Sequence, residues 1–510
     1  MNQAVEKSVS LWMATAKIAR PGPLATDIVA EVCVVGAGIA GLTTAYLLAC
    51  DGVRVVLLDD GPIAGGQSQR TTAHLSNAID DRFYEVERIH GEEGSRLAAE
   101  SHGAAIDRIE SIVHAEAIGC DFTRLDGYLF LAPGESKDTL DRELGAAHRA
   151  GLNGVELIGR APLPSFDTGP CLRFPRQGQF HPLEYLAGLS EAIQQRGGRI
   201  YCDTHVSSVE GGESPKVTTT NDYSVQARAI VVATNPPIND LLVIHTKQAP
   251  YVTYVVGAPV PAGSVTKALY WDTLSSYHYI RLQPSADGAD TLIVGGEDHK
   301  AGQVDDQAER WDRLEGWARE RFPMMGPIQY RWSGMFMETT DGLAFIGSNP
   351  WDKNVYVATG DSGMGMTHGT IAGIILSDLI QGRENRWSKL YDPSRKPVWG
   401  MAWKEYLAEN ANVAKEYVKD WLGGSDISSI DEIEKGSGAL IREGLSKTAV
   451  FRDDQGKLHR RSAICPHLGC IVHWNGAEKT WDCPCHGSRF DPLGRVIKGP
   501  ANTDLANRDA

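Results

Sequence analysis

The sequence has no long uninterrupted hydrophobic run. The stretch Val32–Ala49 comes nearest to one, but three glycines interrupt it and Asp51 follows it closely. This pattern predicts a buried strand, turn and helix, and no membrane span. Residues 1–23 carry scattered charges and no apolar core segment, so no signal peptide is predicted and the expected location is cytoplasmic.

Positive charge is also scarce. The 510 residues have a formal net charge of −15, which argues against nucleic acid or an anionic membrane as a partner. With 42% hydrophobic and 23% charged residues, the composition is that of a globular protein. The length predicts roughly two to four domains.

Cysteines are sparse over most of the chain. Five of the nine are scattered between Cys33 and Cys202, mostly in apolar surroundings. This excludes a general disulfide framework and indicates small buried side chains that stay reduced. The other four lie between Cys465 and Cys485, so this short segment is expected to carry chemistry of its own.

A dinucleotide site is predicted near the N-terminus. The apolar run Val32–Val35 leads into a Gly-x-Gly-x-x-Gly turn and then into a helical pattern. Such glycines permit a tight turn and a close approach of pyrophosphate, and the helix N-terminus offers free N–H groups. A second apolar run ends at Asp59, where a carboxylate suits a ribose hydroxyl. The three glycines are Gly36, Gly38 and Gly41.

Later segments extend this interpretation. Residues 65–74 are rich in glycine and hydroxyl side chains, and a buried strand at 229–233 runs into Thr234. A second glycine-rich turn at 360–369 again precedes a helical pattern, so it too supplies free N–H groups. Residues 250–300, by contrast, alternate as antiparallel strands do.

The four clustered cysteines belong to two motifs that also contain histidine. Cys465-x-His467 is followed, after fifteen residues, by Cys483-x-x-His486. Two thiolates and two imidazoles can hold a tetrahedral zinc ion. They can equally hold a [2Fe–2S] cluster with two cysteines on one iron and two histidines on the other.

Residues 425–500 resemble the Rieske family. The resemblance rests on these two motifs, on the extra cysteine beside each, and on the segments 488–491 and 496–501. It implies a high-potential Rieske [2Fe–2S] cluster, similar to those of cytochrome bc complexes, and a disulfide between Cys470 and Cys485. The chain stops ten residues after Pro500, so a short or missing final strand is expected. The implied cluster ligands are Cys465, His467, Cys483 and His486.

Residues 25–395 resemble the FAD-dependent D-amino-acid oxidase (DAO) family, which includes glycine and sarcosine oxidases. The resemblance is carried by the two glycine turns, by Asp59 and by the loops between them. It implies FAD as the cofactor. Chains that fuse DAO and Rieske parts form a bacterial group, and this chain looks like a member. The implied FAD contacts are Gly36, Gly38, Gly41, Asp59, Thr71, Thr72, Ala73, Val206, Ala233, Thr234, Gly360, Asp361, Gly363, Met364 and Gly365.

The resemblance also implies a fold. We expect an α/β (α+β) FAD-binding Rossmann-like domain with an antiparallel substrate-domain sheet, followed by a small all-β Rieske domain. The FAD-binding part is expected to be discontinuous, with the substrate part at about 116–165 and 236–335. A helical connector is predicted at 396–424 and the Rieske domain at 425–510.

The predicted reaction is hydride transfer from a small amine or amino acid to FAD. Arg281 is expected to grip a substrate carboxylate, although a structural ion pair is an equal interpretation. His299 is the candidate base, and Tyr279 is expected to line the pocket. His181, which precedes a proline, is expected to be structural.

Single electrons would leave through the cluster to an external acceptor that the sequence does not identify. The alternative is a reductase-type module or a redox sensor, in which electrons enter at the cluster. An oxygenase would need a mononuclear iron triad, and the sequence offers no such constellation outside the cluster.

Overall fold

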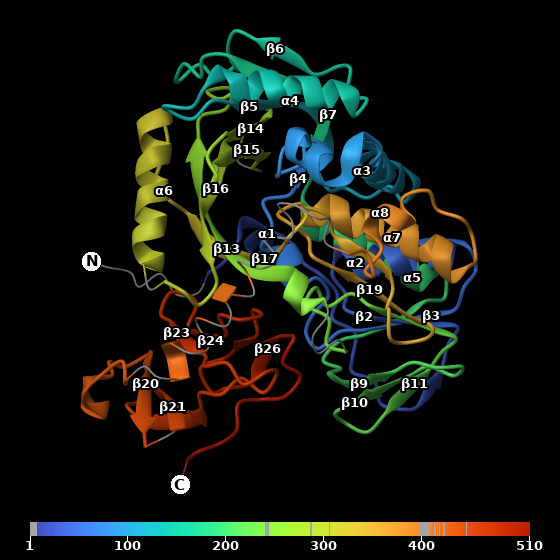
Figure 1. Ribbon diagram of the computed structural model, residues 1–510, viewed down its shortest axis with the longest axis vertical. Coiled ribbons are helices and arrows are strands. Elements are labelled where there is room, and N and C mark those ends of the chain that lie inside the picture. The colour runs from blue at the N-terminus through green and yellow to red at the C-terminus, as the bar shows by residue number, and fades with distance from the viewer. Residues whose placement is uncertain are drawn as a thin grey trace.

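We describe the protein from a computed structural model. It describes residues 8–509 except 240–243, 286–287, 305, 397–408, 410, 413–414, 416, 418, 422–423 and 445. Most of the predicted helical connector at 396–424 lies outside the described residues, and its described positions between 409 and 421 are helical. Figure 1 shows a larger body of helices and sheets with a smaller all-β body against one side.

The larger body is built on a six-stranded sheet. Its four central pairings, from β19 to β8, are parallel, and the edge strand β18 is antiparallel. The predicted apolar runs form its buried central strands, as expected for a parallel sheet covered on both faces. The strand order is β18 (Phe345–Ser348), β19 (Val355–Thr359), β12 (Ala229–Val232), β2 (Val32–Val35), β3 (Val55–Leu58) and β8 (Arg199–Tyr201).

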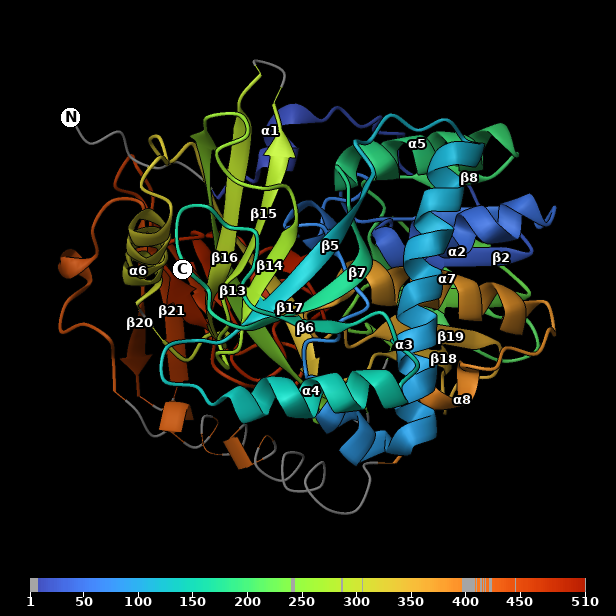
Figure 2. The ribbon, with the colours of Figure 1, turned by 90° about the horizontal axis from the view of Figure 1, so that it is seen from above.

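Each face of this sheet has its own cover, because successive side chains of a strand point to opposite faces. Val34 and Leu57 belong to the hydrophobic core that includes the helices α2 (Ile39–Cys50), α5 (Pro182–Gln195) and α7 (Gly365–Ile380), which lie on one side of the sheet in Figure 2. Val35 and Leu58 pack against a small second sheet instead. That sheet has the order β1 (Ile28–Val29), β11 (Ser224–Gln226), β10 (Lys216–Thr219) and β9 (Val206–Glu210).

The second large element is a nine-stranded sheet. All its pairings are antiparallel except that of β14 with β5. It extends beyond the predicted segments 116–165 and 236–335, because β4 and β7 also join it. The order is β17 (Tyr330–Thr339), β13 (Gln248–Val260), β16 (Asp290–Lys300), β15 (Tyr279–Pro284), β14 (Leu269–Asp272), β5 (Thr123–Phe130), β7 (Cys171–Gln179) and β4 (His74–Leu75), with β6 (Glu156–Ile158) on β7.

The two faces of this sheet differ in what they contact. One face packs against α6 (Gln307–Arg321), with Tyr254 and Trp311 in the shared core. The other face is turned toward the six-stranded sheet, with Val255 and Ile293 in its core. A kinked helix, α3 (Phe83–Ala115), non-helical at Gly91, crosses the molecule beside α7 and α4 (Lys137–Arg149).

A short N-terminal helix, α1 (Leu11–Thr15), was not predicted from the sequence. Its Trp12 is fully buried, and the indole Nε1 donates a hydrogen bond of 2.6 Å to the carbonyl of Thr71. His181 is structural, as expected: it caps α5 by accepting from the backbone N–H of Glu184, and it contacts the Trp12 ring edge. Helix α8 (Ser388–Tyr391) is the last helix of the larger body in chain order.

The smaller body consists of two antiparallel sheets. One contains β20 (Ser437–Glu443), β21 (Ser446–Arg452) and β22 (Leu458–Ser462). The other contains β23 (His473–Asn475), β24 (Thr480–Asp482), β25 (Arg489–Phe490) and β26 (Val496–Lys498). In place of a final strand, Asn507 forms a single bridge with Arg461.

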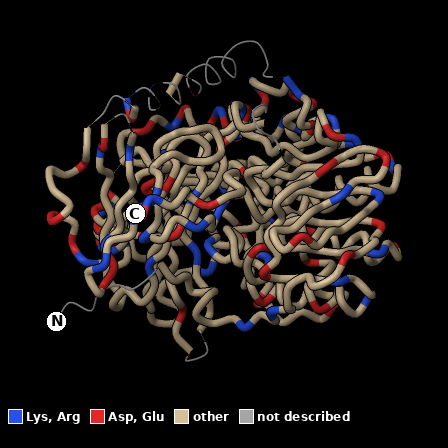
Figure 3. The backbone as a smooth tube through the Cα atoms, turned by 90° about the horizontal axis from the view of Figure 1, so that it is seen from below, with Lys and Arg blue, Asp and Glu red and all other residues tan. Residues whose placement is uncertain are grey.

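Basic and acidic residues are interspersed along the whole trace and do not separate into two halves (Figure 3). Among the helices that the structure describes, none combines the length and apolar character that crossing a membrane requires.

Candidate functional site

A cavity of about 580 Å³ lies between the six-stranded sheet, the nine-stranded sheet and the smaller body. Most of the predicted FAD contacts line it, although they come from six separate segments of the sequence. Those that line it are Gly36, Gly38, Asp59, Thr71, Thr72, Val206, Ala233, Thr234, Asp361, Gly363, Met364 and Gly365.

Gly41, Ala73 and Gly360 are not among the lining residues. They lie behind the cavity wall, where they shape its backbone. A Cβ on Gly41 would overlap the carbonyl oxygen of Gly36, and one on Gly360 would overlap the side chain of Thr339. Ala73 is fully buried with a φ of 60°, and its N–H donates to the hydroxyl of Thr71.

The lining fits a dinucleotide. Gly36 has a φ of +106°, and a Cβ there would lie 2.6 Å from the carbonyl oxygen of Ala233, so only glycine permits this turn. The N-termini of α2 and α7 both open on the cavity, and each supplies N–H groups suited to an anionic or electron-rich ligand. The Asp59 carboxylate accepts from the N–H groups of Ala37 and Gly61, and burial raises its pKa to about 6.

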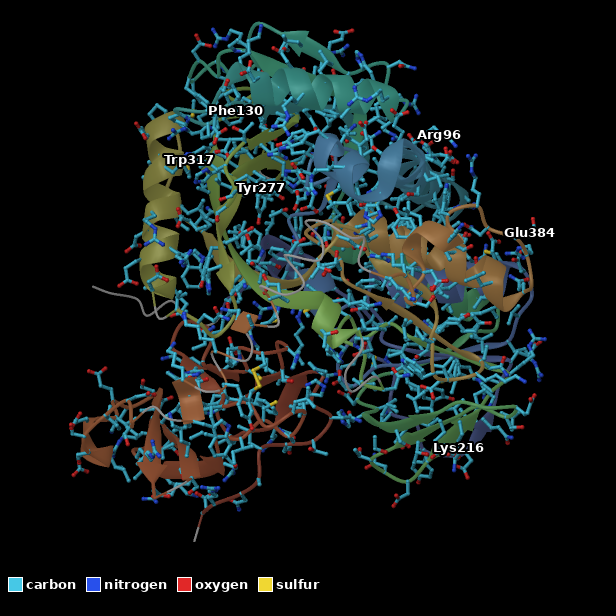
Figure 4. All side chains as sticks on the ribbon, viewed as in Figure 1. Arg96, Phe130, Lys216, Tyr277, Trp317 and Glu384 are labelled. Atoms are coloured by element: carbon cyan, nitrogen blue, oxygen red, sulfur yellow. A yellow bond between two sulfur atoms is a disulfide. The ribbon has the colours of Figure 1, made fainter. Side chains whose placement is uncertain are left out.

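At its other end the cavity is lined by carboxyl groups and aromatic rings. The predicted residue Tyr279 is here, and its hydroxyl lies 2.6 Å from that of Thr253. Tyr277 donates a short hydrogen bond to Asp80, and Figure 4 shows Tyr277 inside the molecule beside the large sheet. Asp298 lines the cavity too, and burial raises the pKa of this carboxyl to about 7.

Arg281 is not in the cavity, so the structure corrects the prediction that it grips a substrate carboxylate. The side chain is fully buried, and one guanidinium nitrogen donates to the carbonyls of Thr72, Ala73 and Phe180. The other donates to the Gln283 side chain, at 2.5 Å. Its guanidinium group therefore joins two backbone segments, residues 72–73 and Phe180, to strand β15 behind the cavity wall.

His299 is also outside the cavity, which corrects its predicted role as a base. Its Nε2 lies 2.8 Å from the hydroxyl of Tyr254, on the face of the sheet that packs against α6. The register of β13 and β16 shifts at this point, and Glu297 adopts a φ of 61°. The irregularity leaves Asp298 on the cavity side, so the preceding residue takes the position expected of His299.

Asp80, Tyr277 and Asp298 were missed by the sequence reasoning. No regular alternation marks Asp298, because Tyr279 pairs with Gly295, and strict alternation from Gly295 would place His299 on the cavity face. No local pattern marks Asp80, because it follows β4 in a loop and reaches the cavity only through the packing of α3 and α7.

The four predicted cluster ligands come together at two loops of the smaller body. Cys465 and Cys483 are buried free cysteines, and the rings of His467 and His486 lie 5.0 Å apart. Among the described residues, the buried Nδ1 of His486 has no hydrogen-bond partner. Two thiols and two imidazoles at one buried place, one of them with an unsatisfied nitrogen, fit the ligand set of a Rieske cluster.

The thiols of Cys465 and Cys483 are in contact. A hydrogen bond from Cys483, with the N–H groups of His467 and Leu468, lowers the pKa of Cys465 to about 7. Such a thiol is close to the thiolate form that ligation requires.

Cys470 and Cys485 form a disulfide that joins the two loops, on the side of the smaller body that faces the larger one (Figure 4). The sulfur atoms of Cys470, Cys483 and Cys485 lie within 4.8 Å of one another. Because the first and third are bonded to each other, only Cys483 among these three can be a ligand.

The cluster loops pack directly on the larger body. The ring of His245, in the short 3-10 turn His245–Lys247, lies 4.8 Å from that of His467 and 5.6 Å from that of His486. Gly487 sits against Pro250 and Met335, leaving no room for a Cβ. Met335 also lines the cavity, so the cluster loop and the cavity share one wall.

The smaller body also completes the cavity. Residues 496–499, 501, 502 and Arg489 form part of its lining. Glu478 ties the two bodies together by accepting from Arg70 at 3.3 Å and from the hydroxyl of Ser333 at 2.5 Å. Arg489 makes a two-pronged ion pair with Asp482, with both N–O distances at 2.9 Å.

Comparisons with known proteins agree with this geometry. The FAD dependent oxidoreductase (DAO) family matches residues 31–379, and the Rieske [2Fe-2S] domain matches residues 426–508. The Rieske 2Fe-2S iron-sulfur protein YhfW of Bacillus subtilis (strain 168) is 32% identical over 99% of this chain and 98% of its own.

Two further relatives match the larger body. Gamma-glutamylputrescine oxidoreductase of Escherichia coli (strain K12) is 28% identical over 78% of this chain and 94% of its own. The crystal structure of glycine oxidase from Geobacillus kaustophilus has a TM-score of 0.61 and 19% identity, and the match covers 72% of this chain and 99% of that one. The latter likeness confirms the fold.

The predicted cofactors, FAD and a [2Fe–2S] cluster, are those of the two matched families. The alternative of a structural zinc site is not supported, because the second family is defined by its iron–sulfur cluster. This chain is therefore a member of the FAD-dependent oxidoreductase (DAO) family that carries a C-terminal Rieske [2Fe–2S] domain.

Proposed function

We propose that this enzyme is a dehydrogenase that oxidises a small amine or amino acid and passes the electrons, one at a time, through its Rieske cluster to an external acceptor. The observation that carries the proposal is the shared wall between the two sites. Met335 lines the FAD cavity and contacts Gly487 of the second cluster loop. A short path between two redox groups favours electron transfer within one chain.

When bound, FAD accepts a hydride from a substrate carbon, and a Rieske cluster exchanges single electrons at a raised potential. The residues of the chain provide the surroundings for this chemistry. Tyr277, Tyr279 and Asp298 line the end of the cavity formed by the large sheet, where they can hold the substrate and accept a proton.

The smaller body excludes water from the cavity and fixes the distance between the two groups. Glu478 holds it to Arg70 and Ser333. His245 lies against both histidines of the cluster site, so these two candidate ligands face the larger body. A cluster held there would be able to exchange electrons with the flavin in either direction.

Anaerobic mixing with a panel of amines and amino acids tests the proposal. We expect one class to bleach the flavin absorbance, after which the cluster becomes EPR-active. A Cys483→Ser variant, which removes a cluster ligand, should still bleach but give no cluster signal. If an external reductant reduces the cluster before the flavin, and no amine or amino acid bleaches the flavin absorbance, the electrons flow from the cluster to the flavin.

A further inference from the structure

We propose that the substrate binds as an alkylammonium cation, not as an amino acid, and that Asp298 is the group that holds the ammonium and takes its proton. This inference rests on the proposed amine or amino-acid oxidation and narrows its substrate class. It comes from the chemistry of the cavity end formed by β13, β14, β15 and β16.

The lining at this end is acidic and aromatic. Asp80 and Asp298 supply two carboxyl groups, and Trp271, Tyr277 and Tyr279 supply three aromatic rings. The rings of Tyr277 and Tyr279 lie 5.4 Å apart at 52°. Carboxylates and aromatic faces together are the surroundings that stabilise an ammonium group removed from water.

The cations near this end are already engaged. Arg82 lines the cavity, and its two terminal nitrogens donate to the backbone carbonyls of Asp80 and Asp272. Arg281 is engaged behind the wall by three other carbonyls. His74 is kept neutral, because burial lowers its pKa to about 3. The substrate end as described therefore offers a carboxylate ligand no bidentate partner.

The side chain of Asp298 has one oxygen atom that can still accept a hydrogen bond. Its Oδ1 is buried and has no hydrogen-bond partner among the described residues. The rest of the Asp298 carboxyl has a hydrogen bond with the side chain of Thr253, and Asp80 accepts from the hydroxyl of Tyr277. A buried carboxyl oxygen without a donor costs free energy, and an N–H group of a bound ammonium would supply that donor.

The proposed step balances as follows. Asp298 takes one proton from the ammonium nitrogen, and the neighbouring C–H bond breaks as its electron pair leaves with the hydrogen as hydride to FAD. The nitrogen lone pair forms a C=N bond, which gives an iminium ion. Water then adds to that carbon and releases a carbonyl compound and an ammonium or alkylammonium ion, which carries the positive charge of the iminium.

Binding of unreactive ions tests the charge preference without turnover. We expect tert-butylammonium, which has N–H groups but no hydrogen on the carbon beside the nitrogen, to perturb the flavin absorbance of the holoenzyme at millimolar concentration. We expect propionate to have no effect. Asp298→Asn should weaken tert-butylammonium binding at least roughly tenfold, since it removes a buried charge partner. Asp312→Asn, the same change on an exposed residue of α6, should bind as wild type does.

A second variant keeps the inference testable if Asp298→Asn does not fold. Tyr279→Leu keeps the charge of Asp298 but removes an aromatic face, and it should also weaken tert-butylammonium binding while FAD stays bound. Tighter binding of propionate than of tert-butylammonium, or unchanged tert-butylammonium binding in Asp298→Asn, would overturn the inference.

Turnover separates this inference from the proposed function. Anaerobic flavin bleaching by butylamine but not by 2-aminopentanoate supports both. Faster bleaching by 2-aminopentanoate leaves amine or amino-acid oxidation standing and overturns the ammonium preference. Binding of tert-butylammonium that depends on Asp298, without bleaching by any amine, supports the cation site and overturns the oxidation.

Discussion

Lys498 is the cation that the Rieske domain brings to the FAD cavity. It lines the cavity, and its buried Nζ has no hydrogen-bond partner within the described structure. Burial lowers its pKa to about 7, with Arg489 lowering it further and Asp361 raising it. An unpaired buried ammonium indicates that an anionic atom of the bound cofactor completes its surroundings.

We therefore expect Lys498→Met to weaken FAD binding by roughly tenfold, the usual cost of losing one charge-assisted contact. The measurement is the dissociation constant of FAD from the apoprotein by fluorescence. Lys479→Met is the matched control, because its Nζ donates to the Gly436 carbonyl at the surface. Equal losses in both variants would show that Lys498 does not face the cofactor.

Asp298 links stability to pH. Its pKa is raised to about 7 by burial, with Asp80 and Glu297 also raising it and Thr253 and Arg310 lowering it. The unfolded carboxyl titrates near 3.9, so keeping Asp298 in the folded state costs nothing below that pH. The cost grows as pH rises from about 4 to 7 and is constant above.

Asp298→Asn should thus stabilise the apoprotein by about 1–3 kcal/mol at pH 8 and leave it unchanged at pH 4. Urea unfolding at the two pH values measures this. An equal effect at both would mean that the carboxyl is not destabilised by burial.

Individual residues also show what can and what cannot be predicted from the sequence. Gly36 and Cys465 belong to local motifs whose spacing is fixed by the ligand, so their place was readable from the sequence. Arg281 and Asp298 differ by burial and by which face of a strand they occupy. The face that Asp298 occupies depends on β13 and β16 pairing with a shifted register, and no short segment of the sequence encodes that shift.

Among the elements, β16 shapes the substrate end most directly. Gly295 lies under the ring of Tyr279, and a Cβ there would overlap that ring. The missing side chain lets Tyr279 lie across the neighbouring strand and into the cavity. Gly127 does the same for Trp271, which pairs with Tyr279 and lies on the same face of the sheet.

Gly295→Ala should displace Tyr279 and slow flavin bleaching by a substrate at least roughly tenfold, because misplaced lining residues cost orientation. FAD affinity should stay the same, since the nucleotide loops lie on another sheet. Gly316→Ala in α6, where nothing lies within 4 Å, serves as the control. Anaerobic stopped-flow absorbance gives the rate, and an unchanged rate would contradict the assigned role of Gly295.

The predicted boundaries of helices and strands agree with the observed ones where a single hydrophobic pattern dominates the segment. The apolar run Val32–Val35 is β2, and the strand predicted at 229–233 is β12. α1 was missed because its five residues carry no periodic pattern long enough to detect. Its stability comes from burial of Trp12, which is a tertiary effect.

At the scale of the whole molecule, Glu478 is the main polar contact between the two bodies. Its side chain is 5% exposed and partners Arg70 and Ser333. Breaking a buried pair leaves the remaining charge uncompensated. The sequence could not reveal this contact, because its partners lie some 400 and 145 positions away.

Glu478→Gln should weaken the docking of the Rieske domain by about 3 kcal/mol and slow electron transfer from flavin to cluster. Glu434→Gln, an exposed residue of the same domain, should do neither. Calorimetry checks the first effect through a separate, earlier transition of the Rieske domain, and stopped-flow absorbance checks the second. A single unchanged transition would exclude Glu478 as the anchor.

The Rieske residues in the cavity wall have a consequence for how the enzyme is made. The C-terminal domain leaves the ribosome last, so the flavin cavity stands open until residues 489–502 are in place. FAD that binds during synthesis meets a cavity without this wall, whereas FAD added to the finished chain meets a cavity that both bodies line.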